Sequence, residues 1–367
     1  MAYRASKTSM PLSEAALIVR AARLYYMDGL QQKRIAEIMR VKSATTIGNW
    51  LKLAEHHQIV RHIIVPPSEV LSHELVTQSL RNAGVKHVIV VPPGTEDDKK
   101  NVYNISIKAA ELIMRQILSI DKREISIAIS CGNTVRQTVL FLIDILRDKI
   151  GWDEDGVQED SKAWHQKLDD LKKNKTLKLY PTTLLGDYKL NYMYPHTLVT
   201  MAHVGLKDTI TNLESYTPTL PKHFYDPKTS GEWQQDFLEK SDILQVVEEA
   251  KNADIIITGI GVTTDASFMA VSSEIGRAFP IPKFPAGTPE ICYVPIPSEG
   301  SPPAEYERGI IGLKPTDLVE AVRREQWVCA VAGGTEKKIA MRSLFRQEKA
   351  PCNILVTDQT IIEALDR

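Results

Sequence analysis

The chain has few features of a membrane protein, a secreted protein or a cysteine-type metal site. No apolar run approaches the ~18 residues that span a bilayer, and no stretch near the N-terminus has the pattern of a signal peptide. Its four cysteines, Cys131, Cys292, Cys329 and Cys352, form no close pair, which argues against a disulfide framework and a zinc site. We therefore predict a cytoplasmic protein, without contact to a membrane, in which these cysteines are buried as small apolar residues.

The common nucleotide-binding fingerprints are also missing. No segment has the GxxxxGK[ST] spacing of a P-loop, and the turn Thr258-Gly259-Ile260-Gly261 lacks the third glycine of a dinucleotide site. The sequence therefore gives no support for a nicotinamide cofactor, and we predict neither a cofactor nor a metal.

The length and the charge distribution indicate more than one domain. A chain of 367 residues is too long for one comfortable hydrophobic core, so we expect two or three domains. The net charge of -1 hides an asymmetry, because residues 1–65 carry +6 and the remainder carries -7. A basic segment attached to an acidic body is typical of a region that meets phosphate, although a solvated basic surface would look the same.

The basic segment has the spacing of three helices, over residues 12–27, 31–39 and 43–57. Ser43 is a good N-cap for the third helix, because its hydroxyl can accept from the N–H groups of Thr45 or Thr46. Gly48 costs about 1 kcal/mol in helix propensity, and we interpret it as a point of close approach to a groove or backbone. Residues 59–65 read as a strand that ends at Pro66-Pro67, and residues 69–82 read as a connecting helix.

After Gly84 the chain alternates between strands and helices. Strands are expected at 85–93 and 124–130, and helices at 99–119 and 134–148. Further strand signals lie at 177–186, 254–261, 327–333 and 353–358. This alternation predicts an α/β domain with a parallel sheet. We expect the charged segment 151–178 to be a helical surface insertion or a mobile excursion, and the proline-rich span 279–303 to be loop that borders a cleft.

Three strand-turn-helix segments are candidates for chemistry. The first contains Gly132, Asn133 and Thr134, where a helix start after a strand favours an anion, although a tight turn without a ligand remains a competitor. The second is the turn of Gly259 and Gly261, at the carboxyl end of a strand.

The third strand-turn-helix segment spans residues 330–344 and carries two adjacent lysines. A lysine in the first helical turn opposes the helix dipole, so Lys337 or Lys338 suggests an anionic partner, with the other one solvated. Glu290 suits ligand hydroxyls, but an exposed loop carboxylate would explain it equally well.

Several blocks in a fixed order give the chain a family resemblance. They are "AARLYYMDGLQQKRIAEIM", "IGNWLKLAEHHQIVRHII", "ISCGNTV", "YTPTLP", "ILQVVEEAKNADIIITGIG", "PEICYVP" and "AVAGGTEKKIAMRSLFRQEKAPCNILVTDQTIIEAL". In this order they resemble the SorC family of bacterial transcriptional regulators, from about residue 14 to 365, except for the segment 151–178.

The resemblance implies a fold and a domain order. It implies an all-α helix-turn-helix domain at 1–65, a linker helix at 66–84, and at 85–367 a Rossmann-like parallel-sheet domain that binds the effector and assembles the protein. That domain would be related to ribose-5-phosphate isomerase and glucosamine-6-phosphate deaminase. The resemblance also implies a homo-tetramer that binds operator DNA of a carbohydrate operon and a phosphorylated sugar or similar metabolite.

The resemblance assigns site residues by matching motifs. Gly132 and Thr134 match the family's phosphate turn. Cys131 and Asn133 replace a frequent tryptophan and arginine, so we expect an effector that either carries less charge or is gripped differently. The implied effector-binding set is Gly132, Asn133, Thr134, Gly259, Gly261, Glu290 and Lys337.

A helix-turn-helix places its second helix in the major groove. Asn49 suits adenine, the threonines suit a phosphate or a thymine methyl, and basic side chains neutralise phosphates. Ala44 and Asn49 stand where the family usually has arginines, so the bases that are read differ. The implied DNA-binding set is Lys33, Arg34, Lys42, Ser43, Thr45, Thr46, Asn49 and Lys52.

Two other classes of function remain open. A sugar-phosphate isomerase or deaminase would use the same fold, with Asp265 or Glu290 as general base, but no motif commits either residue and the basic helices would be unexplained. An adaptor protein would use the N-terminal helices to bind another protein. We therefore predict a ligand-responsive DNA-binding regulator that is not an enzyme.

Overall fold

The computed structural model describes two compact units, Met1–Glu69 and Val70–Arg367. The described residues are 12–26, 30–56, 59–60, 78, 80–92, 98–147, 161–185, 194–221, 223–229, 231–279, 283–297, 304–346 and 350–365. Among them, no helix has the length and apolar character needed to cross a membrane.

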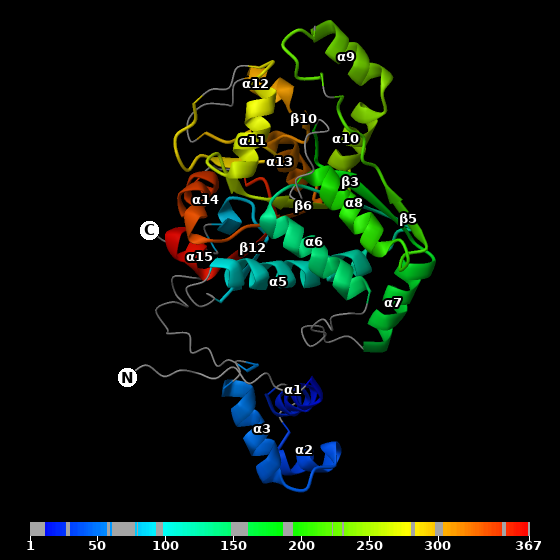
Figure 1. Ribbon diagram of the computed structural model, residues 1–367, viewed down its shortest axis with the longest axis vertical. Coiled ribbons are helices and arrows are strands. Elements are labelled where there is room, and N and C mark those ends of the chain that lie inside the picture. The colour runs from blue at the N-terminus through cyan, green and yellow to red at the C-terminus, as the bar shows by residue number, and fades with distance from the viewer. Residues whose placement is uncertain are drawn as a thin grey trace. The chain divides into compact units, whose positions relative to one another are not determined.

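The first unit contains three helices (Figure 1, blue): α1 (Leu12–Tyr26), α2 (Gln32–Met39) and α3 (Ala44–His56). Their inward stripes meet in a small core that includes Ile18, Ile35, Ile47 and Leu51. Arg40 ends α2 in the left-handed conformation with φ 54°, which turns the chain toward α3. The three helices therefore lie where the apolar spacing predicts them.

The segment between the two units lies mostly outside the described residues. Of the predicted strand 59–65, only residues 59 and 60 are described, and they form a bend instead of a strand. Of the predicted linker helix, residues 78 and 80–82 are described and helical.

The second unit is built on a seven-stranded sheet in which every described pairing is parallel. This confirms the parallel sheet that the alternation of strands and helices predicts and the Rossmann-like fold that the family resemblance implies. The strands, in their order across the sheet, are β1 (His87–Val91), β12 (Ile354–Asp358), β11 (Trp327–Val331), β6 (Ile255–Gly259), β2 (Glu124–Ile129), β3 (Thr176–Pro181) and β5 (Asn212–Ser215).

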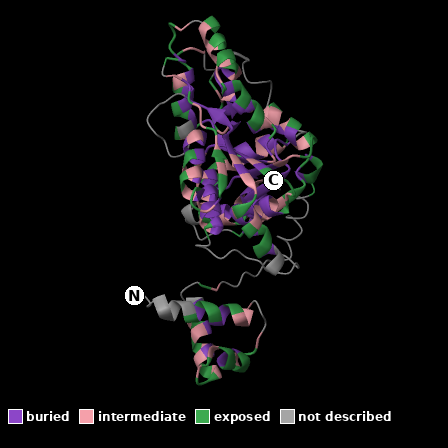
Figure 2. Cartoon of the chain, turned by 90° about the vertical axis from the view of Figure 1, so that its right-hand side faces the viewer, coloured by how far each residue is buried: buried purple, intermediate pink, exposed green. Residues whose placement is uncertain are grey.

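Helices cover both faces of the sheet, so its central strands are buried on both sides (Figure 2). In β6, Ile255 and Ile257 face one helix layer and Ile256 faces the other, because successive side chains alternate. The first layer contains α5 (Asp98–Ser119), α6 (Asn133–Leu146), α7 (Ser161–Lys173) and α8 (Pro195–Leu206). The second layer contains α10 (Ile243–Lys251), α13 (Pro315–Arg323), α14 (Lys338–Phe345) and α15 (Gln359–Leu365).

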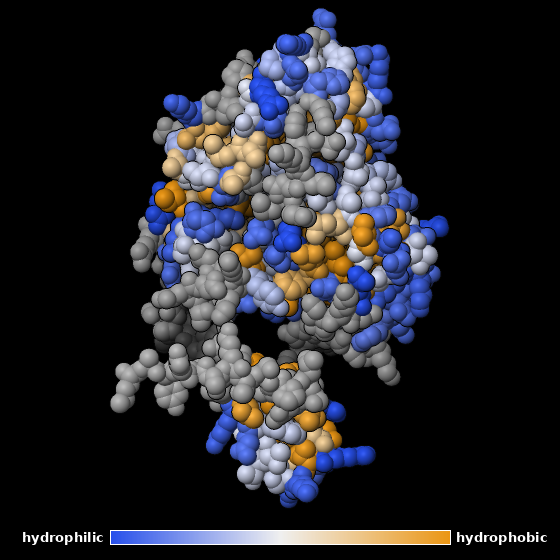
Figure 3. Space-filling view, viewed as in Figure 1, coloured by the Kyte–Doolittle hydropathy of each residue, from blue (hydrophilic) through white to orange (hydrophobic). Residues whose placement is uncertain are grey.

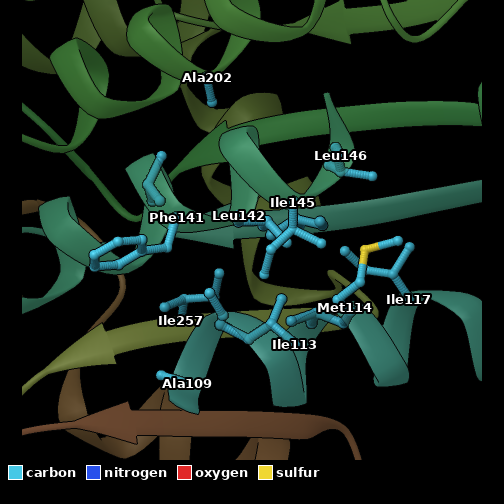
Figure 4. Packing of buried hydrophobic residues seen from close by; sticks show 14 of the residues in the cluster. Ala109, Ile113, Met114, Ile117, Phe141, Leu142, Ile145, Leu146, Ala202 and Ile257 are labelled. Atoms are coloured by element: carbon cyan, nitrogen blue, oxygen red, sulfur yellow. The ribbon is translucent and has the colours of Figure 1, made fainter. Parts of the chain in front are cut away.

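The close packing of α5 against α6 forms the centre of the first layer (Figure 4). Ile113, Met114 and Ile117 of α5 interdigitate with Leu142 and Ile145 of α6. All of these side chains are buried, and removal of a buried Ile or Leu side chain costs about 2–5 kcal/mol. This packing fixes the position of the α6 start, which matters for the site described below.

A third cluster lies beyond the carboxyl ends of β2 and β6 and is rich in aromatic residues. It contains Phe224, Tyr225, Phe268, Tyr293 and Tyr306. Its elements are α9 (Gly231–Lys240), α11 (Ala266–Ile275), α12 (Ala304–Gly309), the pair β4 (Thr183–Leu184) and β10 (Ile311–Gly312), and the sheet of β7 (Gly261–Val262), β8 (Pro289–Ile291) and β9 (Val294–Pro295).

The sequence predicts loop throughout the proline-rich span 279–303. The structure differs, because part of this span forms short strands. Residues 289–295 form a buried two-stranded hairpin, whose turn residues Cys292 and Tyr293 take left-handed φ values of 54° and 65°. Short strands tolerate Pro289 and Pro295 because a proline at the end of a strand removes few ladder hydrogen bonds.

The charged segment 151–178 is only in part described, and its described part is not a surface insertion. Residues 161–173 form α7, and residues 176–178 begin β3 in the main sheet. Trp164, Leu168 and Leu171 are buried against the first helix layer. The helix expected in this segment is therefore confirmed for residues 161–173. Its placement as a surface insertion is wrong, because these three residues recur at helical spacing and face inward. Residues 151–160 lie outside the described part of the chain.

Candidate functional site

A cavity of about 260 Å³ opens at the carboxyl edge of the main sheet. The segments that follow β2, β6 and β11 form most of its wall, together with α11, the hairpin of β8 and α5. The helices after β1 and β2 lie on one face of the sheet and those before β6 and β11 lie on the other, so the cavity occupies the topological switch point. Its lining residues include Val102, Gly132, Asn133, Thr134, Gly259, Gly261, Asp265, Glu290, Glu336 and Lys337.

The sheet thus brings together all seven residues of the effector-binding set. They come from four segments that span about two hundred residues of sequence, and nothing in their spacing along the chain required them to meet.

The start of α6 forms one wall of the cavity. Gly132 has φ +112°, a conformation that favours glycine, and among the described residues no side chain caps this helix start. The carbonyl of Thr134 accepts a hydrogen bond from the buried Ser106 hydroxyl at 3.1 Å, which ties the first turn to α5. The N–H groups of the turn therefore face the cavity without a side-chain cap, in the geometry that favours an anion.

The two glycines after β6 are required by close approach. A Cβ on Gly259 would lie 3.0 Å from the Cys131 carbonyl oxygen and 3.4 Å from Val135. A Cβ on Gly261 would overlap the Glu290 carboxylate and lie 3.3 Å from Asp265 Oδ2. Both carboxylates therefore converge over Gly261.

Glu290 lies on β8 and is 5% exposed, so the alternative of an exposed loop carboxylate is wrong. Its Oε2 accepts a hydrogen bond from the Tyr293 N–H at 2.9 Å. Burial and, to a smaller extent, the nearby Asp265 raise the pKa of Glu290, while the Tyr293 N–H and Lys337 lower it, and the net result is a pKa of about 7. This carboxyl group therefore exchanges its proton near neutral pH.

The third wall is the turn between β11 and α14. Gly334 has φ +103°, and Thr335–Lys337 form a short 3-10 helix that precedes α14. Lys337 lines the cavity, whereas Lys338 lines a separate one with Ile339 and Arg342. The structure therefore places Lys337, which the family resemblance had selected, at this cavity and Lys338 at another.

Asp358, at the end of β12, holds this turn in place, and the sequence reasoning missed it. Its Oδ2 accepts a hydrogen bond from the Gly334 N–H at 2.8 Å. Its Oδ1 accepts from the Ile361 N–H at 3.1 Å and from the Thr360 hydroxyl at 2.6 Å. An acidic residue at the carboxyl end of a predicted parallel strand was the signal that would have found it.

The candidate DNA-binding residues all lie on α2, on α3 or in the turn between them. The cationic side chains of Lys33, Lys42 and Lys52 are exposed. Thr45, Asn49 and Lys52 share one face of α3, since they are separated by four and three residues. Arg34 contacts Glu37 at 2.8 Å, but both side chains are exposed, so this ion pair contributes little to stability.

Ser43 caps α3 as predicted. Its Oγ accepts a hydrogen bond from the Thr46 N–H at 3.3 Å and lies 3.2 Å from the Thr46 hydroxyl. Both hydroxyls therefore have a local partner at the start of the helix, which fixes the turn after α2.

Gly48 is a point of close approach, as its interpretation from the sequence suggests, and its nearest neighbour is a side chain of α2. A Cβ at Gly48 would lie 3.1 Å from Gln32 Oε1, so this glycine allows the start of α2 to approach α3 closely. The observed close approach is within the helix-turn-helix, and approach of Gly48 to a DNA groove stays a prediction.

Comparisons with known proteins agree with this architecture. Residues 214–365 match a family model described as "Putative sugar-binding domain". The full-length sorbitol operon regulator SorC from Klebsiella pneumoniae is similar in structure, with a TM-score of 0.61, 19% identity, and coverage of 96% of this chain and 99% of that one. No curated protein sequence matches the chain.

Two further solved structures each cover about four-fifths of the chain. A DeoR family transcriptional regulator from Listeria monocytogenes has a TM-score of 0.54 and 16% identity, and covers 81% of this chain and 99% of its own. A sor operon regulator from Shigella flexneri has a TM-score of 0.52 and 18% identity, and covers 79% of this chain and 97% of its own. The resemblance to SorC-type regulators is confirmed in fold and in the match to a sugar-binding domain.

Proposed function

We propose that this protein is a DNA-binding transcriptional regulator of a carbohydrate-related operon, controlled by a phosphorylated sugar or similar metabolite. The observation that carries the proposal is the cavity at the switch point, which gathers a helix start, a lysine and three carboxyl groups. The exposed basic side chains of the helix-turn-helix and the fold of the SorC regulator support the DNA-binding part.

The cavity has a complementary group for each part of a sugar phosphate. The phosphate is bound by the N–H groups at the start of α6 and by Lys337, because both attract an anion. The sugar hydroxyls donate to Glu290 and Asp265, which converge over Gly261. Asn133 is exposed beside Gly132 and adds an amide that can pair with either part.

Control of DNA binding requires that the ligand distinguishes two arrangements of the protein. A ligand with equal affinity for both arrangements shifts nothing, so the effector favours one of them.

We propose a homo-tetramer in the cytoplasm. Apolar side chains gather over α5 and α6 (Figure 3), and the exposed Tyr103 of α5 contributes an aromatic ring to this face, which favours self-association.

One observation favours a second candidate, a sugar-phosphate isomerase or deaminase. A buried carboxyl group with a pKa of about 7, such as Glu290, has the proton affinity of a general base at neutral pH. The same carboxyl group also suits hydroxyl recognition, and the enzyme would leave the basic helices without a role. Turnover of a sugar phosphate by the purified protein would support the enzyme.

The test is DNA binding by the full chain, measured on the DNA upstream of its own gene at two salt concentrations, with and without sugar phosphates. We expect binding that weakens steeply with salt and an affinity that changes when a sugar phosphate is added. A protein that binds no DNA at low salt, or whose DNA affinity no sugar phosphate alters, would contradict the proposal.

A further inference from the structure

Among the described residues that line the cavity, acidic side chains outnumber basic ones. Lys337 is the one cationic side chain among the described lining residues, whereas Asp265, Glu290 and Glu336 supply three carboxyl groups. An arginine, which binds phosphate through two parallel hydrogen bonds, does not occur in that lining. The cationic groups therefore suffice for one phosphate, bound by Lys337 and the start of α6.

The carboxyl pair over Gly261 requires hydrogen-bond donors from its ligand. Glu290 Oε2 already accepts from the Tyr293 N–H, while Oε1 is directed over Gly261 into the cavity. Asp265 Oδ2 accepts from the Val262 N–H at 3.2 Å and lies close to the same point. An ionised carboxylate only accepts hydrogen bonds, and so does a phosphate dianion. A hydroxyl or an amine therefore satisfies these oxygens, whereas a second phosphate leaves them unsatisfied and adds repulsion.

We infer that the cavity selects a polyhydroxylated ligand with a single phosphate group and rejects the matching bisphosphate. The inference rests on the proposed function, because it takes the cavity as the site of a phosphorylated sugar. Beyond the proposed function, it specifies that the ligand carries one phosphate group, and it assigns Asp265 and Glu290 as the residues that discriminate against a second phosphate.

The test compares matched ligands by calorimetric titration of the full chain. The probes are glucose 6-phosphate with glucose 1,6-bisphosphate, fructose 6-phosphate with fructose 1,6-bisphosphate, and inorganic phosphate. We expect at least one monophosphate to bind on the order of 100-fold tighter than its bisphosphate, because two like charges separated by a few ångströms repel strongly in a partly buried site.

Two variants assign the selectivity to the carboxyl pair. At pH 8, where Glu290 with its pKa of about 7 is mostly ionised, Asp265→Asn and Glu290→Gln each remove one charge while they retain the shape of the side chain, so each reduces the monophosphate preference by about tenfold. Asp208→Asn is the control, because Asp208 is exposed and lies outside the cavity lining. It leaves the preference unchanged.

The outcomes separate the inference from the proposed function. Binding of a bisphosphate as tightly as its monophosphate, or an unchanged preference in both cavity variants, overturns the inference and leaves the sugar-phosphate site in place. If neither the sugar phosphates nor inorganic phosphate bind, the proposed effector site is wrong and the inference falls with it.

Discussion

The two units build their candidate sites in different ways. The helix-turn-helix residues lie within about twenty consecutive positions, and most of their side chains are exposed. The cavity residues come from separated strands, and Glu290 and Thr134 among them are buried. A surface for a polyanion needs long cationic side chains on one local element, whereas a site for a small ligand needs close approach of several segments. Substitutions should therefore affect the second site through shape and the first through charge.

The largest effect is expected for Gly261→Ala. The new Cβ overlaps the Glu290 carboxylate, so the cavity cannot keep its shape, and we expect sugar-phosphate affinity to fall by on the order of 1000-fold. The free energy of unfolding should fall by about 1–3 kcal/mol, as for other overpacked sites. Calorimetric titration and denaturant unfolding measure the two effects.

Gly231→Ala is the matched control, since a Cβ at Gly231 meets nothing within 4 Å. DNA affinity without a ligand should remain unchanged in both variants. Loss of DNA binding in Gly261→Ala alone would contradict the separation of the two sites.

The next effect concerns the pH dependence of stability. Burial raises the pKa of Glu290 to about 7 from its ordinary 4.5, so the folded state holds this proton more tightly than the unfolded state. The stabilisation is complete below pH 4.5 and is lost as the pH rises through 7, a change of about 3 kcal/mol. Glu290→Gln should remove this dependence. The free energy of unfolding of both proteins, measured from pH 4.5 to 8, checks it, and parallel curves would show that folding does not raise the pKa of Glu290.

Lys337→Ala should have a smaller effect, confined to the ligand. Loss of one charge-assisted hydrogen bond weakens sugar-phosphate binding by about 10- to 100-fold and leaves free-sugar binding unaltered. Lys338→Ala is the control, because its side chain lines a different cavity. Equal losses in the two variants would show that Lys337 acts through the general charge of the region.

The smallest effect is expected for Lys52→Ala in the first unit. Removal of one phosphate contact should reduce the slope of log affinity against log salt by about 0.9, without a change in effector binding. Lys240→Ala, on the exposed surface of α9, should leave the slope unchanged. The affinity for DNA, measured over a series of salt concentrations, distinguishes the two variants.

The sequence predicts the individual strands, turns and helices better than it predicts which of them lie next to one another in the fold. The turns at Gly132, Gly259 and Gly334 follow strands as expected, because glycine in a strand-turn-helix pattern is a local signal. Their convergence depends on the strand order, in which β11 and β6 are neighbours although about seventy residues separate them. Strand order is set by packing of the whole domain, which no local pattern records.

Burial was the other property that the sequence did not reveal. Glu290 stands between prolines and has the composition of a loop, yet the aromatic cluster around Tyr293 and Tyr306 encloses its hairpin. Trp164 and Leu168 stand among many charges, but they pack on the first helix layer. In both cases a few apolar contacts with distant elements outweigh local polarity.

The switch point has a mechanical consequence. The start of α6 belongs to the helix layer on one face of the sheet, and the turn of Lys337 leads into α14 on the opposite face. A ligand bound in the cavity, as proposed, would contact elements that belong to both helix layers. Such a ligand should therefore alter the two outer surfaces of the domain together, and a subunit docked on either surface should respond to it.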